Sequence, residues 1–187
     1  TQPSTMNGGN NFEMSGAGNL DANTLTVANT DGIITLSGTL TGNGGGISKD
    51  DVGTLILSGN NDYTGDTTIN AGTLTAGAVN TIPSASNVIL ANVANATFDL
   101  NNKSQSIGTL SGGGASGGEV KLTGVATALT VNQTADTTYN GLISGNGNLI
   151  KNSSSTLTLS GNNSYSGTTT INAGTLTAGA VNTIPSA

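Results

Sequence analysis

The feature that most constrains this chain is an internal repeat. Residues 54–85 read TLILSGNNDYTGDTTINAGTLTAGAVNTIPSA, and residues 156–187 read TLTLSGNNSYSGTTTINAGTLTAGAVNTIPSA, at an offset of 102 residues. The two copies differ only at Ile56/Thr158, Asp62/Ser164, Thr64/Ser166 and Asp66/Thr168. A fixed internal period of this kind is typical of a chain that stacks similar units on one another instead of folding around one globular core.

A shorter period inside the repeat indicates many short strands. T-L-T or a related tripeptide begins at Thr24, Thr39, Thr54 and Thr73, and again at Thr156 and Thr175, in steps of 15, 15 and 19 residues in the first run and 19 in the second. Further strand candidates are NVIL from Asn87, TFDL from Thr97, IGTL from Ile107, EVKL from Glu119 and ALTV from Ala128. Gly, Asn or Ser punctuates nearly every run, and no long stretch has the 3.6-residue apolar period of a helix.

Two all-β architectures compete for this pattern. A sandwich or barrel usually needs aromatic core residues and regular hairpins, whereas aromatic residues are only 3% of this chain. Small turn residues with stacked Leu, Ile and Val favour a β-solenoid. We therefore predict one β-solenoid segment over residues 1–187, with repeat copies at 53–85 and 155–187, and we expect it to be a fragment of a longer solenoid. Roughly ten coils would make a rod about 50 Å long.

Alternation predicts which side chains face the core. In a strand, successive side chains point to opposite sides, and the Ile56/Thr158 difference marks an outward position between two leucines that both copies share. The residues predicted to point inward are Leu55, Leu57, Ile69 and Leu74 in the first copy, and Leu157, Leu159, Ile171 and Leu176 in the second.

Composition and charge exclude several functions. The net charge is −6, and the only basic residues are the scattered Lys49, Lys103, Lys121 and Lys151. A nucleic-acid-binding surface needs clustered basic residues, so this function is not expected. No apolar run approaches the roughly 20 residues of a membrane helix. No signal peptide stands at Thr1, so we expect a cytosolic protein or a mature or internal piece. The absence of cysteine favours the second alternative, because it suits export through an oxidising periplasm.

The repeat also resembles a known family. The segments GTLILSGNNDYTGDTTINAGTLTAG from Gly53 and STLTLSGNNSYSGTTTINAGTLTAG from Ser155 resemble the autotransporter-associated β-strand repeat, found in passenger domains of type V secreted proteins of Gram-negative bacteria. The matching residues include Gly59, Asn61, Tyr63, Gly65, Thr67, Ile69 and Gly72, with their counterparts Gly161, Asn163, Tyr165, Gly167, Thr169, Ile171 and Gly174. Ser155 departs from the usual glycine.

This resemblance implies a right-handed parallel β-helix on the bacterial cell surface, either attached to the outer membrane or released. It also implies export through an outer-membrane barrel that is not part of this sequence. Members of the family include adhesins, aggregation factors and long stalks. We expect a structural or adhesive segment that acts as a stalk or self-associating filament, with end-to-end contacts or further coils covering its ends. The alternative is a module that binds a host glycan or receptor, and its site would lie in the less repetitive stretch 87–140.

The sequence predicts no enzyme and no catalytic, cofactor or metal site. Without His or Cys, only carboxylates remain for acid–base chemistry. Asp62 and Asp66 lie in an expected turn and are absent from the second copy. Asp50 and Asp51 are adjacent, so a strand would point them to opposite faces.

Three weaker signals have structural interpretations that we favour. The glycine runs at Gly42 and Gly112 lack an Asp ladder and read as turns, which leaves open one weak calcium site near Asp50 or Asp62. Tyr63 and Tyr165 could stack on a glycan, but we expect each ring to cover the core while its hydroxyl finds a partner. The glycosylation sequons begin at Asn95, Asn102, Asn132, Asn152 and Asn162, and we interpret them as turn and ladder residues.

Overall fold

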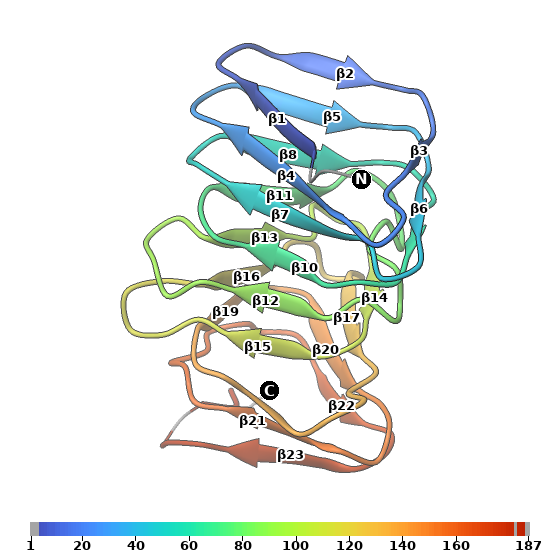
Figure 1. Cartoon of the computed structure of the whole chain (residues 1–187). Coiled ribbons are helices and arrows are strands. Elements are labelled where there is room, and N and C mark those ends of the chain that lie inside the picture. Colours follow the sequence, from blue (N-terminus) through green and yellow to red (C-terminus); the bar gives the residue numbers. More distant parts are fainter. Residues whose placement is uncertain (1–3, 182, 186–187) are drawn as a thin grey trace.

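The computed structural model describes residues 4–181 and 183–185. Within them the chain consists of 23 strands joined by turns and bends, and no helix occurs. The strands form a right-handed stack of parallel coils of about eight turns (Figure 1). The prediction of a right-handed parallel β-solenoid is therefore confirmed.

Most coils contribute one strand to each of three faces. The first face, sheet A, holds β1 (Ser4–Gly8), β4 (Thr24–Asn29), β7 (Gly46–Asp50), β10 (Thr67–Ile69), β12 (Val88–Leu90), β15 (Leu110–Gly112), β18 (Thr137–Tyr139), β21 (Thr156–Leu159) and β23 (Thr175–Ala178). The second face, sheet B, holds β2 (Phe12–Met14), β5 (Ile33–Leu36), β8 (Thr54–Leu57), β11 (Thr73–Ala76), β13 (Thr97–Asp99), β16 (Glu119–Leu122) and β19 (Leu142–Gly145).

The third face is divided into two short sheets. Sheet C holds β3 (Gly18–Asn19), β6 (Leu40–Gly42) and β9 (Asp62–Tyr63), and sheet D holds β14 (Gln105–Ile107), β17 (Ala128–Val131), β20 (Asn148–Lys151) and β22 (Thr169–Ile171). The loop of residues 77–87 separates the two sheets. The Gln105 side chain bridges this gap, because its Oε1 accepts from the Thr81 amide at 3.0 Å and its Nε2 donates to the Ala78 carbonyl at 2.8 Å.

The register explains the uneven steps of the T-L-T motif. Thr54 pairs with Thr73 within sheet B, so the 19-residue step is one full turn. The 15-residue steps lead from Thr24 in sheet A to Leu40 in sheet C and on to Thr54 in sheet B, so each covers two faces. The motif therefore occurs on different faces and does not mark one position in every coil. The expectation of roughly ten coils is too high, since the structure has about eight turns.

Alternation places one apolar core along the axis. Leu55, Leu57, Ile69 and Leu74 are each 0% exposed, as predicted, and so are Leu157 and Leu159. Ile56 is half-buried on the outside, where its counterpart is threonine. The prediction is wrong for Ile171, which is 50% exposed, and only partly right for Leu176, which is half-buried.

The reason for this difference is the absence of a neighbouring coil in the described structure. Ile69 lies between Lys49 and Leu90 in the register of sheet A, with a strand on each side. Ile171 pairs with Lys151 on one side only, because β22 is the last strand of sheet D.

The S-G-N motif has a direct steric cause. At the corner between sheets B and C, successive coils approach so closely that a Cβ on Gly59 would lie 2.1 Å from the carbonyl oxygen of Gly38. The second copy has the same contact at another corner, because Gly161 follows β21 of sheet A and its Cβ would lie 1.8 Å from the carbonyl oxygen of Gly141. Only glycine permits such backbone contact, so the motif fixes the coil spacing at each of these two corners.

Candidate functional site

The most distinctive surface feature is a glycine hairpin at the corner between β15 and β16. Gly114 and Gly117 form an isolated antiparallel bridge, with N–H to carbonyl distances of 2.8 and 3.3 Å. The Asn92 side chain of the preceding coil holds this hairpin, because its Oδ1 accepts from the Ser116 amide at 2.9 Å. Figure 1 shows the loops after β12 and β15 projecting farther than the other corners on the left-hand side.

A shallow groove of about 350 Å³ lies between these two loops. Residues 94–97 and 114–118 line it, together with Glu119, Lys121 and Leu142 of sheet B. A second hollow, of about 530 Å³, lies beside Gly114 and extends to Asn162. Both hollows lie at least partly within the stretch 87–140, which we expected to hold any binding site.

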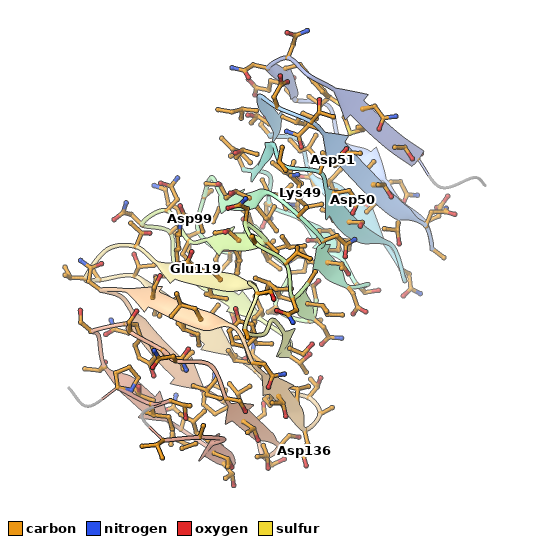
Figure 2. The ribbon with its side chains drawn as sticks, turned by 90° about the vertical axis from the view of Figure 1, so that its left-hand side faces the viewer. Lys49, Asp50, Asp51, Asp99, Glu119 and Asp136 are labelled. Atoms are coloured by element: carbon orange, nitrogen blue, oxygen red, sulfur yellow. The ribbon has the colours of Figure 1, made fainter. Side chains whose placement is uncertain are left out.

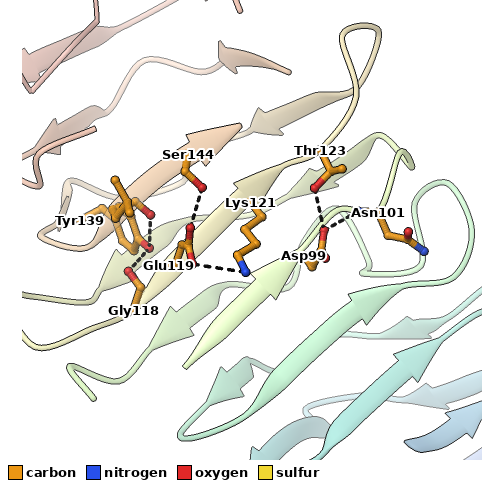
Figure 3. Close-up of polar contacts among 9 residues, drawn as sticks. Asp99, Asn101, Gly118, Glu119, Lys121, Thr123, Tyr139 and Ser144 are labelled. Atoms are coloured by element: carbon orange, nitrogen blue, oxygen red, sulfur yellow. Dashed lines mark hydrogen bonds and ion pairs between the residues drawn. The ribbon is translucent and has the colours of Figure 1, made fainter. Parts of the chain in front are cut away.

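Glu119 is the central charged group of the groove. The Ser144 hydroxyl of the next coil donates to its Oε1 at 2.6 Å, and Lys121 Nζ lies 3.6 Å from its Oε2 (Figure 3). The side chain of Glu119 is 28% exposed and that of Lys121 is 45% exposed, so solvent screens this ion pair. The pair therefore leaves hydrogen-bonding capacity for a ligand at modest desolvation cost.

Asp99 extends the same row of polar side chains. Asp99, Lys121 and Ser144 are in register across β13, β16 and β19. Asp99 Oδ1 accepts from the Asn101 amide at 2.8 Å and from the Thr123 hydroxyl at 3.1 Å (Figure 3). Figure 2 shows Asp99 and Glu119 on one side of the solenoid, with the acidic residues Asp50 and Asp51 farther along it.

Tyr139 lies in the core beneath the groove and contacts one of its lining residues. Its ring is 0% exposed, and its hydroxyl donates to the Gly118 carbonyl at 2.8 Å (Figure 3). Desolvation raises the pKa of Tyr139, and the nearby Glu119 carboxylate raises it further. Gly118 has φ 81°, and a Cβ on Gly117 would lie 1.7 Å from the Val93 carbonyl oxygen, so the hairpin requires glycine at both positions.

This arrangement suits hydrogen bonding better than bond cleavage. Asp99 and Glu119 already accept hydrogen bonds from the Thr123 and Ser144 hydroxyls of neighbouring coils. Backbone amides and carbonyls, with one carboxylate and one ammonium group, can bind hydroxyl or amide groups.

The acidic residues singled out in the sequence are on the surface. Asp62 and Asp66 are exposed, and Asp66 Oδ1 accepts from Asn87 Nδ2 at 2.9 Å. Asp50 Oδ1 accepts from Ser48 Oγ at 2.9 Å and from Asn70 Nδ2 at 2.7 Å. Across the described part of the chain, no group of three or more acidic, His or Cys residues is placed to hold a metal ion. The absence of a metal site stays a prediction, and a weak calcium site near Asp50 or Asp62 stays open.

The two repeat tyrosines are core residues, as predicted. Tyr63 is 0% and Tyr165 1% exposed. The Tyr63 hydroxyl lies 2.8 Å from Thr67 Oγ1, and the Tyr165 hydroxyl lies 2.7 Å from Thr169 Oγ1. Burial raises the pKa of both phenols, while these threonine hydrogen bonds oppose the rise.

The sequon asparagines lie mainly in turns and ladders. Asn95 and Asn102 have φ 69° and 60°, in left-handed turns. Asn152 Nδ2 donates to Asn132 Oδ1 at 3.2 Å, and Asn172 Nδ2 donates to Asn152 Oδ1 at 2.8 Å. These contacts support the structural interpretation of four of the sequons, and Asn162 is exposed beside the second hollow.

Sequence reasoning missed two buried lysines. Lys49 and Lys151 are 0% exposed, although we considered both only as scattered basic residues and did not predict their burial. Lys49 Nζ donates to three backbone carbonyls. They belong to Asp50, to Asp51 (2.8 Å) and to Ala71 (3.4 Å). Burial lowers the pKa of Lys49 to about 8, although the carboxylates of Asp51 and Asp50 oppose the shift. Alternation was the missed signal, because Lys49 shares the inward phase of Ile47.

Comparison with known proteins gives the family of the repeat. The passenger-associated-transport-repeat matches residues 47–76 and 149–178. The chain is 42% identical over 144 residues to the Adhesin BmaC autotransporter of Brucella suis biovar 1 (strain 1330). That match covers 76% of this chain but only 4% of the adhesin. No solved structure gives a significant match.

The structure contains no candidate for a membrane-crossing helix in the residues it describes.

The matched segments contain the inward Leu, Tyr and Lys residues that build the coils described above. Our recognition of the repeat is confirmed, and the chain carries two passenger-associated-transport-repeats, the β-strand repeat of autotransporter passengers.

Proposed function

We propose that this chain is a segment of an adhesin passenger on the surface of a Gram-negative cell, where it acts as an elongated spacer without enzymatic activity. The observation that carries this proposal is the continuous parallel stack, in which one apolar core runs through all three faces. A solenoid of this type gains length with every coil and does not need a closed active site. The likeness to an adhesin autotransporter supports the cellular location.

Replacement of the segment in the surface-displayed passenger tests the spacer. One strain lacks residues 1–187, and a second carries an unrelated β-solenoid of about eight coils in their place. A spacer predicts that adhesion falls in the first strain and returns in the second. Loss of adhesion in both strains would contradict it and favour a binding module.

The glycine-hairpin groove favours a second candidate function, the binding of a glycan or receptor. Small residues of the two loops line it, and Glu119 and Lys121 supply one charge of each sign. A glycan array with the wild-type chain and with Glu119→Gln tests this function. Binding that the substitution weakens would support the groove, and binding unchanged by it would place recognition elsewhere.

Self-association of the rod is part of the structural proposal. Apolar side chains are exposed at both described ends of the stack, with Met14 45% exposed at one end and Ile171 50% exposed at the other. Such coil ends also present strand edges that can pair with further coils or with a second copy. Sedimentation of the chain over a range of concentrations tests this, and a monomer at every concentration would exclude end-to-end stacking.

A further inference from the structure

The two repeat copies occupy different faces of the solenoid. Leu55 lies in β8 of sheet B, whereas its counterpart Leu157 lies in β21 of sheet A. Lys49 lies in β7 of sheet A, whereas Lys151 lies in β20 of sheet D. Nearly identical sequences are thus turned by one face relative to each other, as the positions of these strands in Figure 1 show.

The cause is the length of the repeat. Four turns in sheet A lead from Ile47 to Thr137, through β10, β12 and β15. Two further strands, β19 and β20, then lead to Leu149, which is 102 residues after Ile47. The offset is therefore four full turns of the solenoid plus two faces, which is one face short of five turns. Each strand of the second copy thus lies on a different face from its counterpart in the first copy.

The lysine contacts are the same on both faces. Lys49 Nζ donates to three carbonyls, of Asp50, Asp51 and Ala71. Lys151 Nζ also donates to three carbonyls, and the two longer distances are again 2.8 and 3.4 Å. The acceptors of the second copy are Asn152, Ser153 and Ala173, 102 residues after those of the first.

A buried asparagine repeats the pattern between coils. Asn61 Oδ1 accepts from the Leu40 amide of the preceding coil at 2.8 Å, and its Nδ2 donates to the Thr81 carbonyl of the following coil at 2.8 Å. Asn163 makes the matching contacts to the Ile143 amide and the Thr183 carbonyl. Leu40 belongs to sheet C and Ile143 to sheet B, so this bridge across three coils is also independent of the face.

The exterior of the repeat is not preserved in the same way. All four differences between residues 54–85 and 156–187 fall at positions that are exposed or half-exposed in the first copy. Residues 47–76 contain four aspartates, and residues 149–178 contain none. The shared residues therefore act inside the solenoid, while the outside changes in both direction and charge.

We propose that the passenger repeat is a coil lock that works on any face of the solenoid, and that its exposed residues do not form a ligand site shared by the copies. The lock consists of the lysine with its three carbonyls, the bridging asparagine and the Tyr–Thr pair. This inference goes beyond the spacer function, because it assigns the repeat's shared residues to coil-to-coil contacts and places ligand recognition outside them.

Cysteine pairs test the change of face. This chain has no cysteine, so two introduced thiols are the only ones present. Thr138 and Thr158 are register partners in sheet A, and both point outward. If the copies kept the same faces, Thr158 would instead lie beside Ser144 of sheet B. We expect a short bis-methanethiosulfonate reagent to bridge Thr138→Cys/Thr158→Cys and not Ser144→Cys/Thr158→Cys, and the reverse result would overturn the proposal.

Asparagine variants test the lock itself. Asn61→Leu and Asn163→Leu each remove one bridge and should each lower the unfolding midpoint by about 4 °C or more. The matched control replaces the exposed Asp62 by Ser, its counterpart in the second copy, and should leave the midpoint unchanged. A control shift as large as that of the asparagine variants, or an effect in only one copy, would contradict a lock that works on both faces.

Discussion

The two repeat copies differ more in their surroundings than in their sequence. The first copy lies between other coils, and Ile69 is 0% exposed. The second copy includes the last described strands of the stack, and Ile171 is 50% exposed. Since the two isoleucines have the same local sequence, the difference in burial reflects the strand neighbours, which are two for Ile69 and one for Ile171. The sequence of such a repeat determines which contacts it can make, and the presence of adjacent coils determines which of these contacts form.

The largest expected effect tests whether the interiors of the copies are equivalent. Leu57 and Leu159 are both 0% exposed, so Leu57→Asp and Leu159→Asp should each reduce the free energy of unfolding by about 5 kcal/mol, since each puts an unpaired charge into an apolar core. Urea unfolding followed by circular dichroism measures this. Ile56→Thr is the control and should have little effect. If only one leucine were sensitive, the copies would not share an interior.

A comparison of isoleucine truncations sharpens the role of the following coil. Ile69→Ala should cost about 3 kcal/mol because it leaves a cavity between two strands. Ile171→Ala should cost about 1 kcal/mol, because half of that side chain is already in water. The same urea experiment gives both values. Equal costs would show that a further coil or second molecule covers Ile171 in solution.

The buried lysine makes stability depend on pH. The folded-state pKa of Lys49 is about 8, whereas an unfolded lysine has a pKa of about 10.4. Between these values the unfolded chain binds more protons, so the free energy of unfolding should rise from pH 8 to pH 10. The rise should be smaller in Lys49→Met, where Lys151, whose pKa burial also lowers, keeps its share.

At pH 7, Lys49→Met should cost about 2 kcal/mol, because three backbone carbonyls lose their donor. Thermal unfolding of both proteins at pH 7, 8, 9 and 10 checks the two effects together. An identical pH profile for wild type and variant would show that Lys49 does not titrate in this range.

The smallest expected effect concerns the exterior. Exchange of Ile56, Asp62, Thr64 and Asp66 for their second-copy counterparts should change the free energy of unfolding by no more than about 0.5 kcal/mol. These side chains are exposed or half-exposed. Calorimetry of the fourfold variant measures the difference, and a larger loss would assign a structural role to the outside of the first copy.

Much of the fold could be predicted because strand alternation is local. The pattern at Leu55, Ile56 and Leu57 fixes which side faces the core, whatever lies above or below. The face that each strand occupies is not local, because it depends on the summed lengths of all preceding turns. For this reason, the sequence predicted coils but not the change of face between the copies.

The groove and the buried lysines show two further limits. The groove depends on close contact between Gly117 and Val93, which lie in successive coils. No sequence motif predicts that contact. Lys49 was missed for another reason, since lysine is rarely buried and its charge outweighed its position in the alternation. The three carbonyls that receive it come from turns of two different coils.

The direction of the hydrogen bonds has a mechanical consequence. In a stack of parallel coils, the bonds between strands run along the axis of the rod, so tension between its ends pulls directly on one coil boundary at a time. The turn from Ile47 to Thr67 contains 20 residues, which can extend to about 70 Å but occupy only ~4.8 Å in the stack. Each coil that detaches would lengthen the tether by roughly 65 Å, so a cell held by such a rod could yield to a sudden pull without losing its hold.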